Sequence, residues 1–87
     1  MALKDQVSPQ SKSPLYQQIY QLLRTKILSG QWRPGDMLPS EADLMEQYQV
    51  SRATVRQAID ELASDGLIYR KQGKGTFVSP PTVEQGL

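Results

Sequence analysis

Apolar residues recur at helical spacing in the first third of the chain, between a proline and a glycine. The positions that fall on one face of a helix are Leu15, Ile19, Leu22, Leu23 and Ile27. Pro14 suits the first turn of a helix, and Gly30 is the residue type that most often ends one. The pattern therefore predicts a helix over about residues 14–29.

Two further helices are predicted, each opened by a serine. Ser40, followed three residues later by Asp43, resembles a capping box and predicts a helix over about residues 41–48. Ser51 caps a helix predicted over about residues 52–65. The apolar face of this third helix consists of Val55, Ala58, Ile59 and Leu62. The short gap between the second and third helices is the spacing of a helix-turn-helix.

The C-terminal pattern is that of a β-hairpin. Residues 67–71 and 76–78 are runs of strand-forming residues, and the tip between them, residues 72–75, holds two glycines and one lysine. The predicted fold class is mainly α with a small β-hairpin. Three helices followed by a β wing describe a winged helix-turn-helix.

The connection between the first two helices, residues 31–39, holds two prolines and one glycine and predicts a structured turn. We expect Trp32 to cover the core and residues 37–38 to form a short strand. Trp32, Phe77 and the four tyrosines lie within apolar patterns or turns, which favours core packing over base stacking.

Eighty-seven residues suffice for one domain. Residues 1–13 are polar and without periodicity, and predict a flexible N-terminal arm. The winged helix is expected over residues 14–78. Residues 79–87, which include two adjacent prolines, are expected to form a linker or tail.

The composition removes most catalytic chemistry. The chain has no cysteine and no histidine, so thiol catalysis, Ser-His triads and zinc fingers lack their essential atoms. We expect no enzyme activity, no catalytic or metal site and no cofactor. No apolar run approaches the roughly 18 residues that a membrane span needs. The predicted location is the cytoplasm, without a membrane partner.

The net charge of +1 hides a strong segregation along the chain. Residues 1–40 carry five basic and two acidic side chains, residues 41–66 carry two and six, and residues 67–87 carry three and one. A chain can thus present a basic face without a basic total.

The two arginines of the acidic middle segment, Arg52 and Arg56, lie one helical turn apart and point away from the apolar face of the third helix. This helix start is the end that enters the DNA major groove in a helix-turn-helix. Arginine binds guanine bidentately and also binds phosphates. Ser51, Thr54 and Gln57 stand beside the arginines as further donors.

Two simpler interpretations stay open. Arg52 and Arg56 would be solvated, or paired with Asp60 or Glu46, if the helix has no nucleic-acid role. The glycines at the hairpin tip would serve the turn alone, and the lysines would only add solubility. With a DNA role, the narrow tip at Gly73 and the cation of Lys74 suit a minor groove.

The segment LPSEADLMEQYQVSRATVRQAIDELASDGLIYRKQGKGTFV, preceded by PLYQQIYQLLRTKILSGQWRPGD, resembles the N-terminal DNA-binding domain of the GntR family of bacterial transcription regulators. The combination of PLY, SGxWxPGD, LPSE, VSRATVRQA and GKGTFV carries the resemblance, and the W-PGD and TVRQA forms are similar to the HutC branch. The resemblance implies a dimeric regulator, expected to be a repressor, that binds a palindromic operator in double-stranded DNA.

The resemblance also implies roles for individual residues. It puts Arg52 on a guanine and Arg56 on the DNA backbone. It implies that Ser51, Ala53 and Thr54 approach phosphates. The wing-tip residues that it brings to the minor groove are Gln72, Gly73 and Lys74.

The chain departs from the family pattern in two respects. Ala42 stands where many relatives have an arginine that joins the operator contact, so their operator preference does not carry over. Family members also have a C-terminal effector domain, which is absent here. The chain is then either an isolated DNA-binding domain of a longer regulator, which we favour, or a naturally short protein. We expect the isolated domain to be monomeric or weakly dimeric by itself. The alternatives are a protein-binding winged helix and a nonspecific DNA-binding protein.

Overall fold

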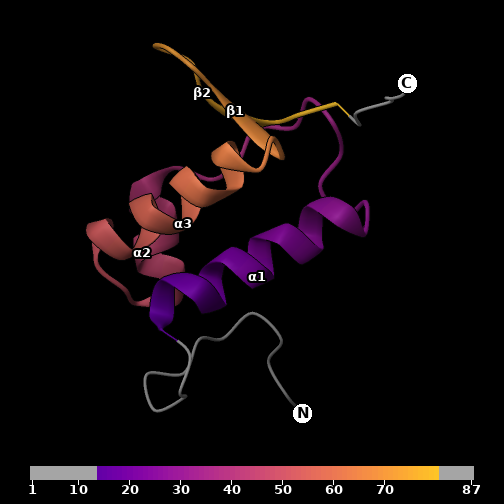
Figure 1. Cartoon of the computed structure of the whole chain (residues 1–87). Coiled ribbons are helices and arrows are strands. Elements are labelled where there is room, and N and C mark those ends of the chain that lie inside the picture. Colours follow the sequence, from indigo (N-terminus) through magenta and orange to yellow (C-terminus); the bar gives the residue numbers. More distant parts are fainter. Residues whose placement is uncertain (1–13, 81–87) are drawn as a thin grey trace.

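The computed structural model describes residues 14–80 and contains three helices and a two-stranded antiparallel hairpin in that region (Figure 1). The elements are α1 (Leu15–Leu28), α2 (Glu41–Tyr48), α3 (Arg52–Ser64), β1 (Ile68–Lys71) and β2 (Gly75–Val78). Every boundary lies within one residue of its prediction. The predicted winged helix-turn-helix is confirmed. The predicted arm and residues 81–87 of the predicted tail lie outside the described residues.

Both predicted serine caps form. The Ser40 hydroxyl accepts the backbone N–H of Asp43 at 3.0 Å, and the Ser51 hydroxyl accepts that of Thr54 at 3.2 Å. Each bond satisfies a donor that has no partner inside its own helix. The turn between α2 and α3 is made by Gln49, whose φ of 57° places it in the left-handed region. The caps and this turn fix the start of α3 relative to α2.

The core lies where α1 crosses α3, with α2 and the base of the hairpin closing it (Figure 1). Its buried apolar residues are Ile19, Leu23, Leu38, Leu44, Tyr48, Val55, Ala58, Ile59, Leu62, Ile68 and Val78. The predicted apolar face of α3 is therefore entirely buried. Trp32 is half-buried against this core, as expected, and lies 5.8 Å from the Lys26 ammonium. Lys26 itself is buried, which the helical pattern did not indicate.

A third segment of the chain joins the two strands of the wing. In β1 and β2, Ile68 pairs with Val78 and Lys71 with Gly75. Residues 36–38 run along the other edge of β2, where the Leu38 N–H donates to the Thr76 carbonyl at 2.8 Å. The strand expected at residues 37–38 is thus a single bridge, Met37 to Phe77. One aromatic expectation is wrong: Tyr69 is 40% exposed and stacks on Phe77 instead of entering the core.

No helix between residues 14 and 80 is long and apolar enough to span a bilayer.

Candidate nucleic-acid interface

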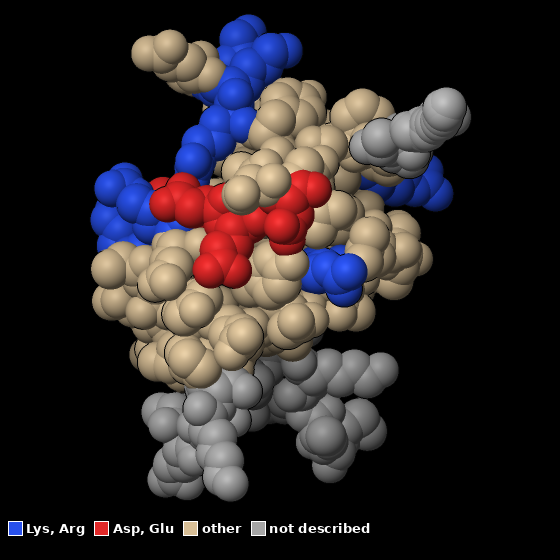
Figure 2. Space-filling model, viewed as in Figure 1, with Lys and Arg blue, Asp and Glu red and all other residues tan. Residues whose placement is uncertain are grey.

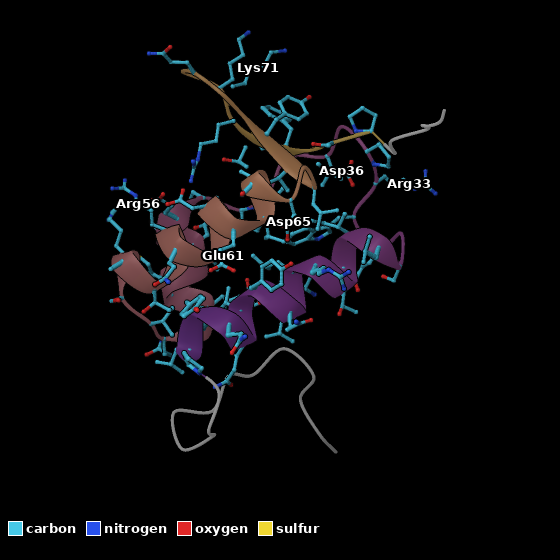
Figure 3. All side chains as sticks on the ribbon, in the orientation of Figure 1. Arg33, Asp36, Arg56, Glu61, Asp65 and Lys71 are labelled. Carbon is cyan, nitrogen blue, oxygen red and sulfur yellow. The ribbon has the colours of Figure 1, made fainter. Side chains whose placement is uncertain are left out.

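The predicted site residues fall into two groups, one at the start of α3 and one at the tip of the wing. Figure 3 shows Arg56 projecting from the first turns of α3 and Lys71 projecting from the wing. Figure 2 shows basic atoms at both places, with an acidic patch beside them across the middle of the face in view. Glu61 lies on the last turns of α3 and Asp65 just beyond its end, both on the side of α1 (Figure 3). The charge segregation of the sequence therefore persists on the surface.

The two arginines of α3 meet at one carboxylate, that of Glu41 in the first turn of α2. Arg52 donates from Nη1 to Glu41 Oε1 at 3.0 Å. Arg56 donates from Nε to Oε2 at 3.3 Å and from Nη2 to Oε1 at 3.5 Å. The Arg side chains are 56% and 60% exposed, whereas that of Glu41 is 27% exposed. A half-covered anion thus holds two accessible cations.

The pairing suggested by the simpler interpretation is wrong, because neither Asp60 nor Glu46 binds these arginines. Asp60 lies more than a turn further along α3 and accepts a 2.6 Å ion pair from Arg70 of β1. The serine-capped start of α2 brings Glu41 to the first turns of α3 instead. The sequence analysis did not predict Glu41 as the partner of the arginines. The available signal was that Glu41 is the acidic residue directly after the Ser40 cap.

The remaining predicted residues of α3 also lie at its start. The Ser51 and Thr54 hydroxyls are 3.0 Å apart, so one hydrogen joins them and the second is free to bond elsewhere. Ala53 and Gln57 are exposed beside them. The structure therefore brings Ser51, Arg52, Ala53, Thr54, Arg56 and Gln57 together at one end of the helix.

The predicted wing-tip residues, Gln72, Gly73 and Lys74, form the exposed turn between β1 and β2. The Lys74 N–H donates to the Lys71 carbonyl at 2.9 Å and closes the turn. Gly73 has a φ of 77°, which side chains other than glycine adopt with difficulty. The Gly73 backbone is therefore needed by the turn itself, and Lys74 supplies the cation.

A groove of about 810 Å³ separates the two groups. The start of α2 forms one wall, with Ala42 on it, and the wing forms the other through Lys74 and Thr76. Arg52 reaches into the same groove. The charged residues that line the groove are Glu41 and Asp43 on the α2 side, Arg52 of α3, and Lys74 on the wing.

The later half of α3 is tied to its neighbours by polar contacts. The Arg70 to Asp60 ion pair holds β1 against α3. Tyr20 of α1 donates its hydroxyl hydrogen to Asp65. This hydrogen bond, aided by desolvation and by the negative charge of Asp65, raises the pKa of the Tyr20 phenol above 10.0. Within residues 14–80, no three acidic, histidine or cysteine side chains are grouped to hold a metal ion.

Comparison with known proteins agrees with the fold. Residues 15–78 match the family described as bacterial regulatory proteins, gntR family. The chain is 48% identical over 81 residues to the HTH-type transcriptional repressor NagR of Bacillus subtilis, covering 93% of this chain and 33% of that protein. It is 45% identical over 75 residues to the histidine utilization repressor of Klebsiella aerogenes, covering 86% and 31%. The chain thus spans about a third of these relatives.

Solved structures agree as well. The DNA-binding domain of AraR in complex with operator ORE1 superposes with a TM-score of 0.76 at 40% identity, covering 84% of this chain and 89% of that one. YtrA of Sulfolobus acidocaldarius, a GntR-family transcription factor, gives a TM-score of 0.80 at 31% identity, covering 93% and 84%. The match of residues 15–78, together with these winged helices, shows that the chain belongs to the GntR family of bacterial regulatory proteins.

Proposed function

We propose that the chain binds double-stranded DNA sequence-specifically and thereby regulates transcription as a repressor. The start of α3 lies in the major groove, and the tip of the wing at residues 72–74 lies in the adjacent minor groove. The observation that carries the proposal is the pair Arg52 and Arg56, exposed in the first turns of a capped recognition helix. The relatives support it, since NagR is named a repressor and AraR was solved on an operator.

The guanidinium geometry supports a division of work between the two arginines. Among the described residues, Arg52 uses one Nη1 hydrogen on Glu41, which leaves its whole Nε–Nη2 edge open. Two parallel donors are what guanine N7 and O6 require. Arg56 instead spends its Nε–Nη2 edge on Glu41. Arg52 therefore reads a guanine, and Arg56 contacts the backbone.

Further phosphate contacts come from residues around this pair. The free hydroxyl hydrogen of Ser51 or Thr54 donates to a phosphate, and exposed Ala53 and Gln57 approach the duplex beside them. Lys74 enters the minor groove, where negative potential concentrates.

The partner is a palindromic operator bound by two copies of the chain, whose half-sites lie about 34–36 Å apart if spaced by one helical turn. We place dimerisation and any effector response in the part of the longer relatives that lies outside the matched region. The proposed site of action is the cytoplasm, and the role is one of binding, without enzymatic turnover.

Selection of a random duplex library by the purified chain tests the function. We expect enrichment of a short half-site with guanine at its strongest position, and affinity for the winners that falls steeply with salt. Binding without enrichment would favour a nonspecific DNA-binding protein. Failure to bind DNA at low salt would contradict the proposal and favour a protein-binding winged helix.

A further inference from the structure

We propose that Glu41 is a positioning residue that sets the ratio between specific and nonspecific DNA binding, by competing with phosphates for Arg52 and Arg56. This inference rests on the proposed function. It gives a function to a carboxylate that lies among the proposed DNA-binding cations and would otherwise only reduce their affinity for DNA.

Glu41 lies where a negative charge is unfavourable for DNA binding. A negative side chain beside a DNA-binding helix repels phosphates, so it lowers affinity for every duplex. Glu41 is nevertheless in hydrogen-bond contact with both arginines, and its side chain is more covered than either of theirs. One carboxylate therefore satisfies donors on two residues that a phosphate would otherwise occupy.

The contact is also easily exchanged. Ion pairs between exposed side chains contribute little to stability, because water screens both partners. Arg56 is 60% exposed, and its contacts with Glu41 are 3.3 and 3.5 Å long, at the weak end of hydrogen bonding. A duplex can displace these contacts without disturbing the core.

The DNA group that replaces Glu41 as the partner of an arginine differs between random DNA and the specific site. On random DNA, an arginine that leaves Glu41 gains a phosphate oxygen, which is a similar anion. At a guanine, Arg52 gains two parallel bonds from its open Nε–Nη2 edge while its Nη1 stays on Glu41. Glu41 thus penalises phosphate-only complexes and orients Arg52 for the base.

Glu41→Gln tests the inference, with Asp43→Asn as the matched control. Both acids lie in the first turn of α2, so either change removes one negative charge from the same place. No contact of the Asp43 side chain with the arginines is recorded within residues 14–80. Dissociation constants would be measured on the selected half-site and on random duplex, over a range of salt concentrations.

For Glu41→Gln, we expect affinity for random duplex to rise about 3- to 10-fold and affinity for the half-site to change less than about 2-fold. The specificity ratio then falls, and the salt slope on random DNA steepens by about one unit as a phosphate contact is added. For Asp43→Asn, both affinities are expected to shift together, so the ratio stays constant.

The inference is overturned if the two variants change the ratio equally, because Glu41 would then act only through its charge. It is also overturned if Glu41→Gln lowers both affinities together with the melting temperature, since that marks a structural role. A wild-type chain without sequence preference overturns the proposed function itself, which separates that failure from this one.

Glu41→Asp keeps the test valid if the glutamine variant does not fold. Aspartate is favourable in the first turn of a helix and keeps the charge. It is one methylene shorter and is not expected to span both arginines, so the specificity ratio should still fall. An unchanged ratio in Glu41→Asp would overturn the inference.

Discussion

Two carboxylates, one at each end of α3, make contacts with different roles. Glu41 holds the exposed arginines at the start of the helix, whereas Asp65 accepts the Tyr20 hydroxyl from α1 just beyond its end. The first contact concerns a surface that must be able to change partners. The second is an exposed contact that joins α1 to the residue after the end of α3.

The Tyr20 contact makes stability depend on alkaline pH. The pKa of Tyr20 is raised above its unfolded value of 10.0, so the contact contributes fully below pH 10 and is lost as pH rises through the folded-state pKa. We expect the difference in unfolding free energy between wild type and Tyr20→Phe to be constant up to about pH 9 and to shrink above pH 10. Urea unfolding at several pH values measures it, and a pH-independent difference would contradict the assignment.

The two arginines should respond differently to truncation. Arg52→Ala is expected to cost about 1–3 kcal/mol on the selected site and to relax specificity at one position, because a bidentate base contact is lost. Arg56→Ala is expected to weaken all sequences evenly, as loss of a phosphate contact does. Binding of both variants to site and random duplexes decides the matter, and equal losses for Arg52→Ala on both would refute its role.

Single residues also mark the limit of sequence reasoning at the site. Arg52 and Arg56 were predictable because helical periodicity alone puts them opposite the apolar face of α3. Their partner Glu41 was not, because it lies on another helix, and its proximity depends on the angle set by the turn at Gln49. The periodicity of a helix in the sequence predicts which of its side chains are exposed. It does not predict which residues of a neighbouring helix contact those side chains.

At the scale of elements, the wing contains a glycine that is required by a contact with a segment distant in the sequence. Gly75 has a φ of 134°, and a Cβ there would lie 2.9 Å from Met37 Sδ. The atoms that a Cβ would meet belong to the Met37 side chain, which is 61% exposed and would have to move aside. The sequence predicted a short strand at residues 37–38 and a narrow glycine tip, but it did not indicate that residues 36–38 lie along β2 next to Gly75.

We therefore expect Gly75→Ala to destabilise the wing by about 1–3 kcal/mol through backbone strain and displacement of Met37. Gly73→Ala is the control, because its φ of 77° is also positive but nothing lies within 4 Å of the added methyl group. Chemical denaturation compares the two, and a larger loss in Gly73→Ala would contradict the packing argument.

At the scale of the whole molecule, the binding surface depends on a small core. Leu23 of α1 is fully buried where α1 meets α3, and Leu28 on the same helix is 57% exposed. The core residues were largely predictable, because their helical spacing is regular. Buried Lys26 was not, since a lysine on a helix is ordinarily solvated.

Leu23→Ala should cost about 2–5 kcal/mol of stability, a large part of what a domain of this size has. DNA binding would then fall on all sequences, in proportion to the folded fraction. Leu28→Ala should stay within about 0.5 kcal/mol of wild type. Thermal melting alongside DNA titration checks both, and normal stability of Leu23→Ala would contradict the described packing.

The hairpin has a further consequence for association between molecules. Within residues 14–80, β1 pairs with β2 alone, so the outer edge of β1 presents free backbone donors and acceptors. Such an edge invites strands of other chains and leads to aggregation unless charges discourage it. Arg70 and Lys71 occupy half of this four-residue strand. Arg70 is paired with Asp60, so Lys71 is the residue of this strand whose charge discourages pairing with another copy. We therefore expect neutralisation of Lys71 to lower the solubility of the protein first.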